Sequence, residues 1–259
     1  MDKSILNIDC EKEKARILNF LRETFKKQNI KNAVVGLSGG LDSATSFYFL
    51  REVLEPENIY IAHLYYFEPC LSMLNLLLKE SKIPEKNIQI ISIKHNVDEI
   101  AKSLGIEQRE ENKIRIGNIA ARVRMIFLYD LAKKNNALVC GTENRSEKFL
   151  GYFTRFGDEA SDIEPITHLF KTQVLQLASY LGIPKAIIMQ KPTAGLWAGQ
   201  TDEDEFGFTY EEADQVLYLR FDKHFSVEQI KKMGLENAEK IILYVKRNEF
   251  KQKTPYRIL

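Results

Sequence analysis

The hydrophobic pattern of the chain alternates between stretches with helical spacing and short, continuously apolar runs. Residues 10–27 place their apolar side chains on one stripe, which predicts an amphipathic helix. Apolar or β-rich runs that end in turn residues predict strands. These runs cover residues 33–37, 59–66, 87–94 and 137–140. Because strands that alternate with helices form βαβ units, the sequence predicts an α/β fold with a doubly wound, mostly parallel, Rossmann-like sheet flanked by helices.

Further helices are predicted where apolar residues recur at helical spacing. They cover residues 44–54, 71–82, 112–134 and 171–181, and three more open near residues 209, 226 and 235. Thr209 and Ser226 each stand three residues before a Glu or Gln, which predicts capping boxes. The last helix is predicted to be amphipathic, with Leu235, Ala238, Ile242 and Val245 on its apolar face.

Residues 145–165 differ from their surroundings because they show little periodicity. A segment of this length without regular structure predicts a binding loop. The sequence contains no internal repeat, low-complexity tract or Gly/Ser-rich linker. We therefore assign residues 1–259 to a single domain and expect the helices from about residue 209 to pack on it.

Composition narrows the possible classes of protein. A hydrophobic content of 44% with 28% charged residues is ordinary for a soluble globular protein, and a net charge of +1 gives no basic field for nucleic acid. No apolar run approaches bilayer length, and the first residues lack the apolar segment of a signal peptide. Cys10, Cys70 and Cys140 are isolated, which predicts reduced thiols. We expect a cytoplasmic protein without membrane or nucleic-acid partners.

Candidate chemistry begins where the strand at residues 33–37 meets the following helix through the turn SGGLDS, residues 38–43. This arrangement directs backbone N–H groups and the positive end of a helix dipole toward an anion, and glycines let the backbone approach a phosphate. One alternative is that Asp42 or Ser43 simply caps the helix. The Lys of the common loop G-x-x-x-x-G-K-[ST] is absent, and an Asp suits a Mg²⁺-bound pyrophosphate. We predict an ATP phosphate loop.

Three other segments carry polar or charged residues that bear on a possible site. Residues 141–144 break the fourth strand at its carboxyl end, where ligands of open α/β sheets collect. The acidic run at residues 202–205 predicts, by itself, a solvated loop. Arg115, Arg122 and Arg124 lie off the apolar stripe of the helix at residues 112–134, which predicts solvent-exposed arginines.

The turn SGGLDS resembles the pyrophosphatase loop S-G-G-x-D-S of the N-type ATP pyrophosphatase superfamily. Six further stretches are similar, in order and spacing, to the ammonia-dependent NAD synthetase family. They are GNIAARVRM, VCGTENRSE, LGYFTRFGD, residues 165–171, KPTAGLW and DEDEFGFTYEEAD. The resemblance is weaker over the first 30 residues, over residues 67–82 and over the C-terminal helices.

The resemblance implies an adenine nucleotide alpha hydrolase-like fold and a ligase. ATP would adenylylate the nicotinate carboxylate of deamido-NAD⁺ with release of pyrophosphate, and ammonia would displace AMP to give NAD⁺. The family also implies Mg²⁺ and a homodimer with the dinucleotide near the subunit interface. No glutaminase-like region accompanies this domain, so the predicted nitrogen donor is ammonia, either free or from a partner chain.

Site residues carried over from the family fall into three sets. The ATP-binding set is Gly36, Leu37, Ser38, Gly39, Gly40, Leu41, Asp42, Ser43, Thr142, Lys171 and Thr193. The deamido-NAD⁺ set is Arg122, Arg155, Asp162, Phe250 and Lys251, and the implied metal ligands are Asp42 and Glu147. Without the resemblance, Glu147 would be interpreted as an exposed acid of a loop or helix start. Lys171 opposes the dipole at a predicted helix start, which favours a functional role.

The sequence also departs from the family pattern. Arg155 stands where most relatives carry Lys, Phe250 where many carry His, and Gly195 where the common motif T-A-D-L has Asp. Residues 67–70 lack the polar pattern expected around the adenine. Two alternatives therefore stay open: a related amidotransferase that acts on another carboxylate, and a non-catalytic nucleotide-binding homologue. A tRNA substrate would predict a basic patch and often paired cysteines, and the net charge of +1 and the isolated cysteines argue against it.

Overall fold

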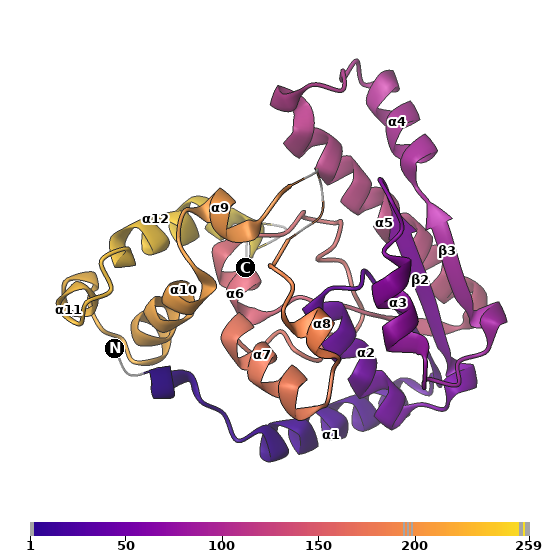
Figure 1. Cartoon of the computed structure of the whole chain (residues 1–259), viewed down its shortest axis with the longest axis horizontal. Helices are drawn as coiled ribbons and strands as arrows, with labels where there is room; N and C mark the ends of the chain where they lie inside the picture. The colour runs from indigo at the N-terminus through magenta and orange to yellow at the C-terminus, as the bar shows by residue number, and fades with distance from the viewer. Residues whose placement is uncertain (1–2, 194, 196, 198, 254–255, 257–259) are drawn as a thin grey trace.

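A parallel β-sheet forms the centre of the computed structural model, which describes residues 3–193, 195, 197, 199–253 and 256 (Figure 1). The strands are β1 (Asn32–Gly36), β2 (Ile59–Tyr65), β3 (Ile88–Ser92) and β4 (Ala137–Cys140). They pair in parallel in the order β3-β2-β1-β4. This topology confirms the predicted doubly wound α/β fold. Val35 pairs with Cys140, so β1 and β4 end side by side, and Gly36 pairs with Ala62, so β2 extends beyond them to Tyr65.

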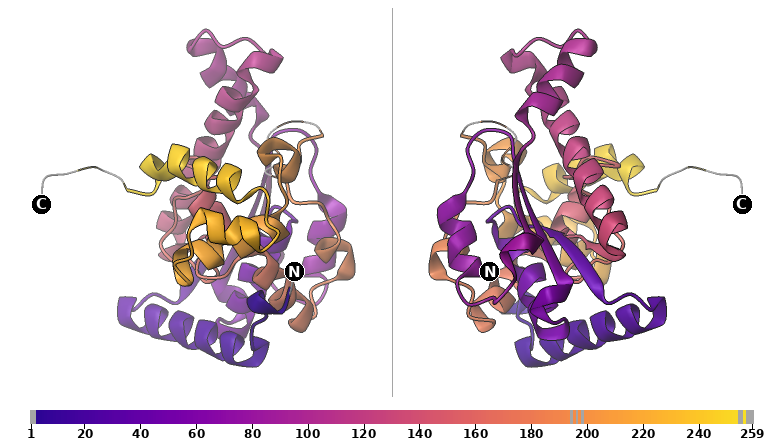
Figure 2. Two further views of the ribbon diagram at one scale, coloured as in Figure 1. Left: turned by 90° about the vertical axis from the view of Figure 1, so that its left-hand side faces the viewer. Right: turned by 90° about the vertical axis from the view of Figure 1, so that its right-hand side faces the viewer.

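Helices cover both faces of the sheet, as Figures 1 and 2 show. One face is covered by α1 (Cys10–Gln28), α2 (Leu41–Val53), α3 (Leu71–Leu78) and α7 (Lys171–Tyr180), and the other by α4 (Lys94–Ser103) and α5 (Lys113–Asn135). Alternate residues of β1 serve the two cores, because successive side chains of a strand point to opposite faces. Ala33 and Val35 belong to the first cluster and Val34 to the second.

Five further helices contribute to a third hydrophobic cluster beside the sheet. They are α6 (Arg145–Leu150), α9 (Asp202–Phe206), α10 (Tyr210–Leu217), α11 (Val227–Lys232) and α12 (Ala238–Asn248). The short helix α8 (Lys185–Ile188) packs on the first core. Short 3₁₀ or π segments cover Lys3–Leu6, Pro56–Asn58, Glu85–Asn87, Glu110–Asn112, Tyr218–Asp222 and Glu249–Lys251. Helix α10 contacts α6 and α7, which supports the single-domain assignment; that assignment stays a prediction. Over the described ranges, no helix is long and apolar enough to cross a membrane.

Several local predictions were wrong or incomplete. Helix α4 was missed, and the supposed binding loop at residues 145–165 begins with α6. The acidic run at residues 202–205 is helical rather than a solvated loop, and Asp202 is buried. Thr201 caps α9 by accepting from the N–H of Asp204, and acidic side chains in a first turn complement the helix dipole.

The two predicted capping boxes had different outcomes. Ser226 and Gln229 form both bonds of the box at the start of α11. Thr209 accepts from the N–H of Glu212, but the carboxylate of Glu212 instead accepts from the backbone and side-chain N–H groups of Asn237. That carboxylate therefore joins α10 to the segment before α12, because a tertiary partner competes with the local one.

Gly151 ends α6 against α12 and offers a test of this packing. Its φ is +64°, and a Cβ atom there would lie 2.5 Å from Cβ of Asn248. We predict that Gly151→Ala lowers the free energy of unfolding by about 2–4 kcal/mol, from left-handed strain plus overpacking. Gly105 has a φ of +65° and open space around it, so Gly105→Ala should cost only about 1–2 kcal/mol. Urea unfolding of both variants measures the difference; equal losses would contradict the packing argument.

Candidate active site

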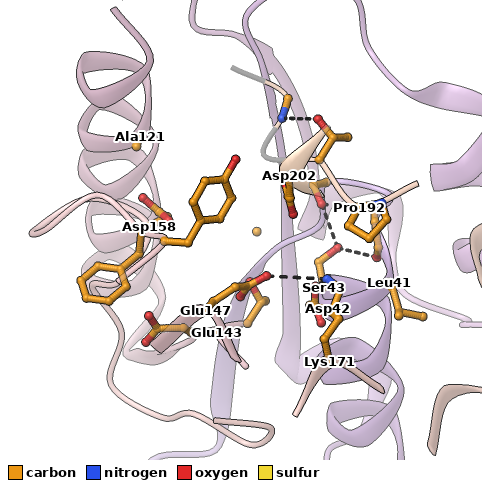
Figure 3. Close-up of a pocket in the computed structure, with 18 of the residues that line it drawn as sticks. Leu41, Asp42, Ser43, Ala121, Glu143, Glu147, Asp158, Lys171, Pro192 and Asp202 are labelled. Atoms are coloured by element: carbon orange, nitrogen blue, oxygen red, sulfur yellow. Dashed lines mark hydrogen bonds and ion pairs between the residues drawn. The ribbon is translucent and has the colours of Figure 1, made fainter. Parts of the chain in front are cut away.

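A cavity of about 1140 Å³ opens at the carboxyl ends of the strands. Its walls come from the turn after β1, the ends of β2 and β4, one face of α5, and segments around α6, α7 and α9. Figure 3 shows Ala121 of α5 on one wall and Asp42 and Ser43 of α2 on the opposite one. Ligands of open α/β sheets bind at this edge, so the fold itself selects this cavity as the candidate site.

The turn between β1 and α2 leaves the start of α2 uncapped by side chains. Gly40 is the N-cap residue and makes no side-chain cap bond. The alternative interpretation, in which Asp42 or Ser43 caps the helix, therefore does not hold. Ser43 Oγ instead lies 3.1 Å from the carbonyl oxygen of Gly40, to which it donates, and 3.0 Å from Ser38 Oγ. The N–H of Gly40 donates to Ser38 Oγ over 3.2 Å. Within the described residues, the next three N–H groups of α2 have no side-chain acceptor at the cavity edge, as an anion site requires.

Only the first of the two glycines in the turn needs a left-handed backbone. Gly39 has a φ of +92°, whereas Gly40 has a φ of −84°. A Cβ atom on Gly39 would also lie 3.2 Å from Cβ of Met73, a residue of α3. The turn therefore combines a strained backbone position with close packing against the segment after β2.

Lys171 brings two distant carboxylates together at the centre of the site. Its Nζ atom forms an ion pair with Asp42 Oδ2 and lies 3.6 Å from Glu147 Oε1. Asp42 comes from α2, Glu147 from α6 and Lys171 from the first turn of α7. All three side chains are largely buried. The two candidate metal ligands, far apart in sequence, therefore face one shared cation.

Burial and like charge set the protonation of this group. Burial, followed by the neighbouring charge of Asp42, raises the pKa of Glu147 to about 8. Burial alone would lower the pKa of Lys171, but Asp42 and Glu147 together raise it above its ordinary value. Lys171 is closer to Asp42 than to Glu147. Its charge therefore does not offset the effect of burial on the pKa of Glu147. The site holds an excess of acid that one more cation would relieve.

Hydrogen bonds hold these three side chains in place. Asn144 caps α6 in a complete capping box with Glu147, and its Nδ2 atom donates to Asp42 Oδ1 over 3.3 Å. Behind them, Asp214 of α10 accepts from Ser146 Oγ, and Ser146 Oγ accepts from the backbone N–H of Lys171 over 2.8 Å. Burial raises the pKa of Asp214 to about 6. Asp214 thereby joins α10 to the starts of α6 and α7 behind the site.

A second acidic wall was missed by the sequence analysis. Tyr152 donates to Glu205 Oε2 over 2.9 Å, and Tyr210 donates to Asp202 Oδ2 over 3.1 Å. Burial raises the pKa of both tyrosines above their ordinary values. Lys171 Nζ also lies 5.4 Å from the centre of the Tyr210 ring. The motif DEDEFGFTYEEAD contains Asp202, Glu205 and Tyr210 but not Tyr152. The helix-start signal that Thr201 gives three residues before Asp204 was overlooked, so the acids were interpreted as a solvated run.

The structure brings most of the predicted site residues into one cavity. Its lining includes Gly36, Leu37, Ser38, Gly39, Gly40, Leu41, Asp42, Ser43, Thr142, Glu147, Lys171, Thr193 and Lys251. Thr193 Oγ1 accepts from the N–H of Gly195, the position where the family pattern has Asp. Ala194 and Leu196 of the same motif lie outside the described residues. The roles of all these residues stay predictions.

The predicted dinucleotide contacts are mostly elsewhere. Arg122 donates to the carbonyl oxygen of Arg155, and the guanidinium of Arg155 lies 5.3 Å from the centre of the Phe250 ring. These three residues form one group outside the cavity lining. Asp162 is also outside, and its carboxylate accepts from the N–H of Val139 in β4 over 2.7 Å. Lys251 lines the cavity, but its ammonium donates to two backbone carbonyls.

The residues present suit a magnesium ion that a bound ligand completes. No group of three or more His, Cys, Asp or Glu side chains within the described ranges is arranged to hold a metal by itself. Asp42 and Glu147 supply two carboxylates at one cationic position. Mg²⁺ is usually held by one or two carboxylates together with phosphate oxygens, so this pair fits that ion.

Comparison with known proteins gives a consistent picture. The sequence model of the family described as NAD synthase matches residues 13–255. The chain is 40% identical to the NH₃-dependent NAD⁺ synthetase of Fusobacterium nucleatum, covering 96% of both chains. It is 38% identical to the enzyme of the same name from Thermococcus sibiricus, covering 96% of this chain and 97% of the relative.

Two solved structures are similar over nearly the whole chain. The NMN synthetase of Francisella tularensis superposes with a TM-score of 0.81 at 31% identity, covering 97% of this chain and 99% of the other. The NH₃-dependent NAD synthetase of Campylobacter jejuni, solved with a nitrate ion, has a TM-score of 0.78 at 27% identity. The superposition covers 97% of this chain and 100% of the Campylobacter jejuni chain.

Glu143 gives the site a pH-dependent stability that can be measured. Among the described residues its Oε1 atom has no hydrogen-bond partner, and burial, then Glu164 and Glu147, raises its pKa to about 9. The folded protein therefore keeps a proton that the unfolded chain releases above its ordinary pKa of 4.5, and stability falls as pH rises from about 4.5 to 9. We predict that at pH 9 the free energy of unfolding of Glu143→Gln is higher than that of the wild type by at least ~1 kcal/mol.

Urea unfolding at pH 5 and pH 9 tests this prediction. The difference between Glu143→Gln and the wild type should grow toward pH 9. Glu57 is exposed, so Glu57→Gln should show the same pH dependence as the wild type. Parallel curves for the wild type and Glu143→Gln would contradict a raised pKa at Glu143.

Proposed function

The chain belongs to the NAD synthase family, and on that premise we propose that it is an ammonia-dependent NAD⁺ synthetase. It would amidate the nicotinate carboxylate of deamido-NAD⁺ with ATP and ammonia and release AMP and pyrophosphate. One observation carries the proposal: Asp42 of the phosphate loop and Glu147 of α6 meet at Lys171 inside the cavity. A non-catalytic nucleotide-binding homologue has no need of this buried excess of acid.

The phosphate loop would hold the ATP tail. The uncapped start of α2 offers backbone N–H groups and a positive dipole end to the phosphates. Lys171 adds a full charge, because Asp42 and Glu147 keep it protonated. Thr142 and Thr193 line the same cavity and supply hydroxyl groups to ATP. These roles rest on the placement of the side chains and on the family motifs.

Asp42 and Glu147 would hold the Mg²⁺ ion together with phosphate oxygens of ATP. The ion would neutralise the negative charge that accumulates when two polyanionic substrates meet. Its binding would relieve the repulsion that raises the pKa of Glu147. Asn144 contacts both carboxyl groups and so fixes their separation before the ion arrives.

The reaction divides into two displacements. In the first, a carboxylate oxygen of the substrate attacks the α-phosphorus of ATP, a P–O bond forms, and the bond to pyrophosphate breaks. In the second, neutral ammonia attacks the acyl carbon, the bond to AMP breaks, and the nitrogen loses a proton. The cavity walls exclude water that would otherwise hydrolyse the adenylate. The described acids near the phosphate loop supply acceptors for the released proton.

We also propose a homodimer that completes the dinucleotide site. Arg122, Arg155 and Phe250 gather at the surface rather than in the cavity. Apolar side chains around them are exposed, among them Phe156 at 58% and Ile126 at 57%. A second subunit over this surface would cover them and bring the arginines to a shared ligand. The cytoplasmic location, by contrast, rests only on the sequence, although Cys10, Cys70 and Cys140 are free thiols.

Amidation of the mononucleotide is a second candidate. The superposed NMN synthetase has the higher TM-score of the two structures described above. Four of the five predicted dinucleotide contacts lie outside the cavity, and a smaller substrate would not need them. An assay with deamido-NAD⁺ and with nicotinate mononucleotide, each with ATP, Mg²⁺ and ammonium, separates the two functions by their kcat/KM values.

We predict that Asp42→Ala lowers NAD⁺ formation by at least about 100-fold, because even residues behind metal ligands contribute about 10–100-fold. Purified protein is assayed for NAD⁺, AMP and pyrophosphate with ATP, Mg²⁺, deamido-NAD⁺ and ammonium. Asp130 is an exposed residue of α5, so Asp130→Ala should keep the wild-type rate. A wild-type rate in Asp42→Ala would remove the metal assignment, and an inactive wild type would remove the function.

We expect the protein to sediment as a dimer of twice its chain mass of 30.0 kDa. Analytical ultracentrifugation at the concentrations used for the assay measures this mass. A fully active species at the mass of one chain would show that the site needs no second subunit.

A further inference from the structure

Arg124 is a cavity-lining cation that forms no ion pair with any described residue. Its Nε atom donates to the carbonyl oxygen of Leu64 over 3.0 Å. In the described ranges no carboxylate lies within ion-pair distance of its guanidinium, and its Nη atoms make no hydrogen bond. The sequence analysis expected an exposed arginine, but Arg124 is partly buried in the cavity wall. That expectation was wrong, because Leu64 draws the side chain over the end of β2.

The position of Arg124 is set by two independent elements. It belongs to the face of α5 that carries Ala121, Met125 and Leu128, all of which line the cavity. Its anchor at Leu64 stands two residues beyond Ala62, which pairs with Gly36 at the start of the phosphate loop. Strands rise about 3.3 Å per residue and lie about 4.8 Å apart. The guanidinium is therefore held over the strand next to the loop, on the side toward which a ligand must extend.

A buried, unpaired arginine has a cost that its protein must offset. Burial lowers the pKa of Arg124, and the charge of Asp158 acts against this shift. Arginine nevertheless stays charged in proteins. Asp158 compensates this charge only in part and forms no ion pair with it. A charge without a direct partner in a partly dry site disfavours the folded state unless a ligand supplies the opposite charge. The planar fork of the Nη atoms is suited to phosphate and carboxylate groups, which it binds through two parallel hydrogen bonds.

We propose that Arg124 binds a phosphate or carboxylate anion of the bound reactants, over the carboxyl end of β2. The inference rests on the proposed function and adds a substrate-binding residue to it. Arg122, the arginine implied by the family motif, is exposed and donates to backbone carbonyls of Asn118 and Arg155. Arg124, two residues later, has free donors inside the cavity. The two arginines would thus contact different parts of the reactants.

The test compares Arg124→Gln and Arg124→Lys with the wild type. Arg124→Gln should raise the Kd of either Mg²⁺–ATP or deamido-NAD⁺ at least about 10-fold, because hydrogen bonds to a charged group are lost. Arg124→Lys keeps the charge but loses the fork, so its Kd should be intermediate. Titration calorimetry with each ligand alone identifies the source: a change for ATP assigns an ATP phosphate, and a change for deamido-NAD⁺ assigns its phosphate or carboxylate.

A structural role is excluded by the melting temperature of the unliganded variants. If Arg124 serves a ligand, Arg124→Gln should melt at the wild-type temperature or above it, because an unpaired buried charge has been removed. Arg115 lies on the same helix and is exposed, so Arg115→Gln is the matched control and should change neither Kd. Unchanged affinity for both ligands, or weaker binding with a lower melting temperature, would overturn the proposal. If Arg124→Gln forms NAD⁺ with unchanged KM values for ATP and deamido-NAD⁺, the proposal for Arg124 is overturned and the proposed function stands.

Discussion

The ion pair between Lys171 and Asp42, with Glu147 beside it, is the constraint around which this molecule is arranged. Two buried carboxylates repel each other, and one ammonium does not neutralise both. The fold tolerates this group because three separate helix starts meet at the ends of parallel strands. A helix start offers N–H groups and a positive dipole end, which favour nearby carboxylates and disfavour a lysine. Lys171 therefore stays at its position through its partners rather than through its helix.

The surrounding protein makes the arrangement rigid. Asn144 contacts Asp42 and Glu147 at once, so the two carboxylates cannot move apart independently. Asp214 anchors the start of α7 through Ser146 and through the backbone N–H of Thr172, 2.9 Å away. Because Asp214 belongs to α10, the C-terminal helices contribute to the geometry of the site as well as to its lining. A catalytic group held by packed helices is placed more accurately than one held by a loop.

The sequence predicted those features whose determinants lie within a short stretch of the chain, and it failed where a residue's surroundings come from other segments. The strand–turn–helix around Gly39 is encoded within about twenty residues, and the structure has that strand, turn and helix, with the turn in the cavity wall. Its binding of ATP stays a prediction. The predicted strand at residues 137–140 coincides with β4. Asp202 and Arg124 were misjudged because their environment comes from distant partners. The carboxylate of Asp202 accepts from Tyr210, and Arg124 donates to the carbonyl oxygen of Leu64. The local sequence pattern shows neither contact.

The divergent segment after β2 is joined to the phosphate loop by a buried imidazole. His63 Nδ1 lies 2.8 Å from the carbonyl oxygen of Leu37, and Nε2 accepts from the N–H of Cys70 over 3.0 Å. Since Nε2 must be an acceptor, the neutral ring carries its hydrogen on Nδ1 and donates it to Leu37. Both bonds use backbone groups of the partner residues, so they impose little on the side chains of residues 67–70. The segment can therefore lose the polar pattern of its relatives while the loop keeps its conformation.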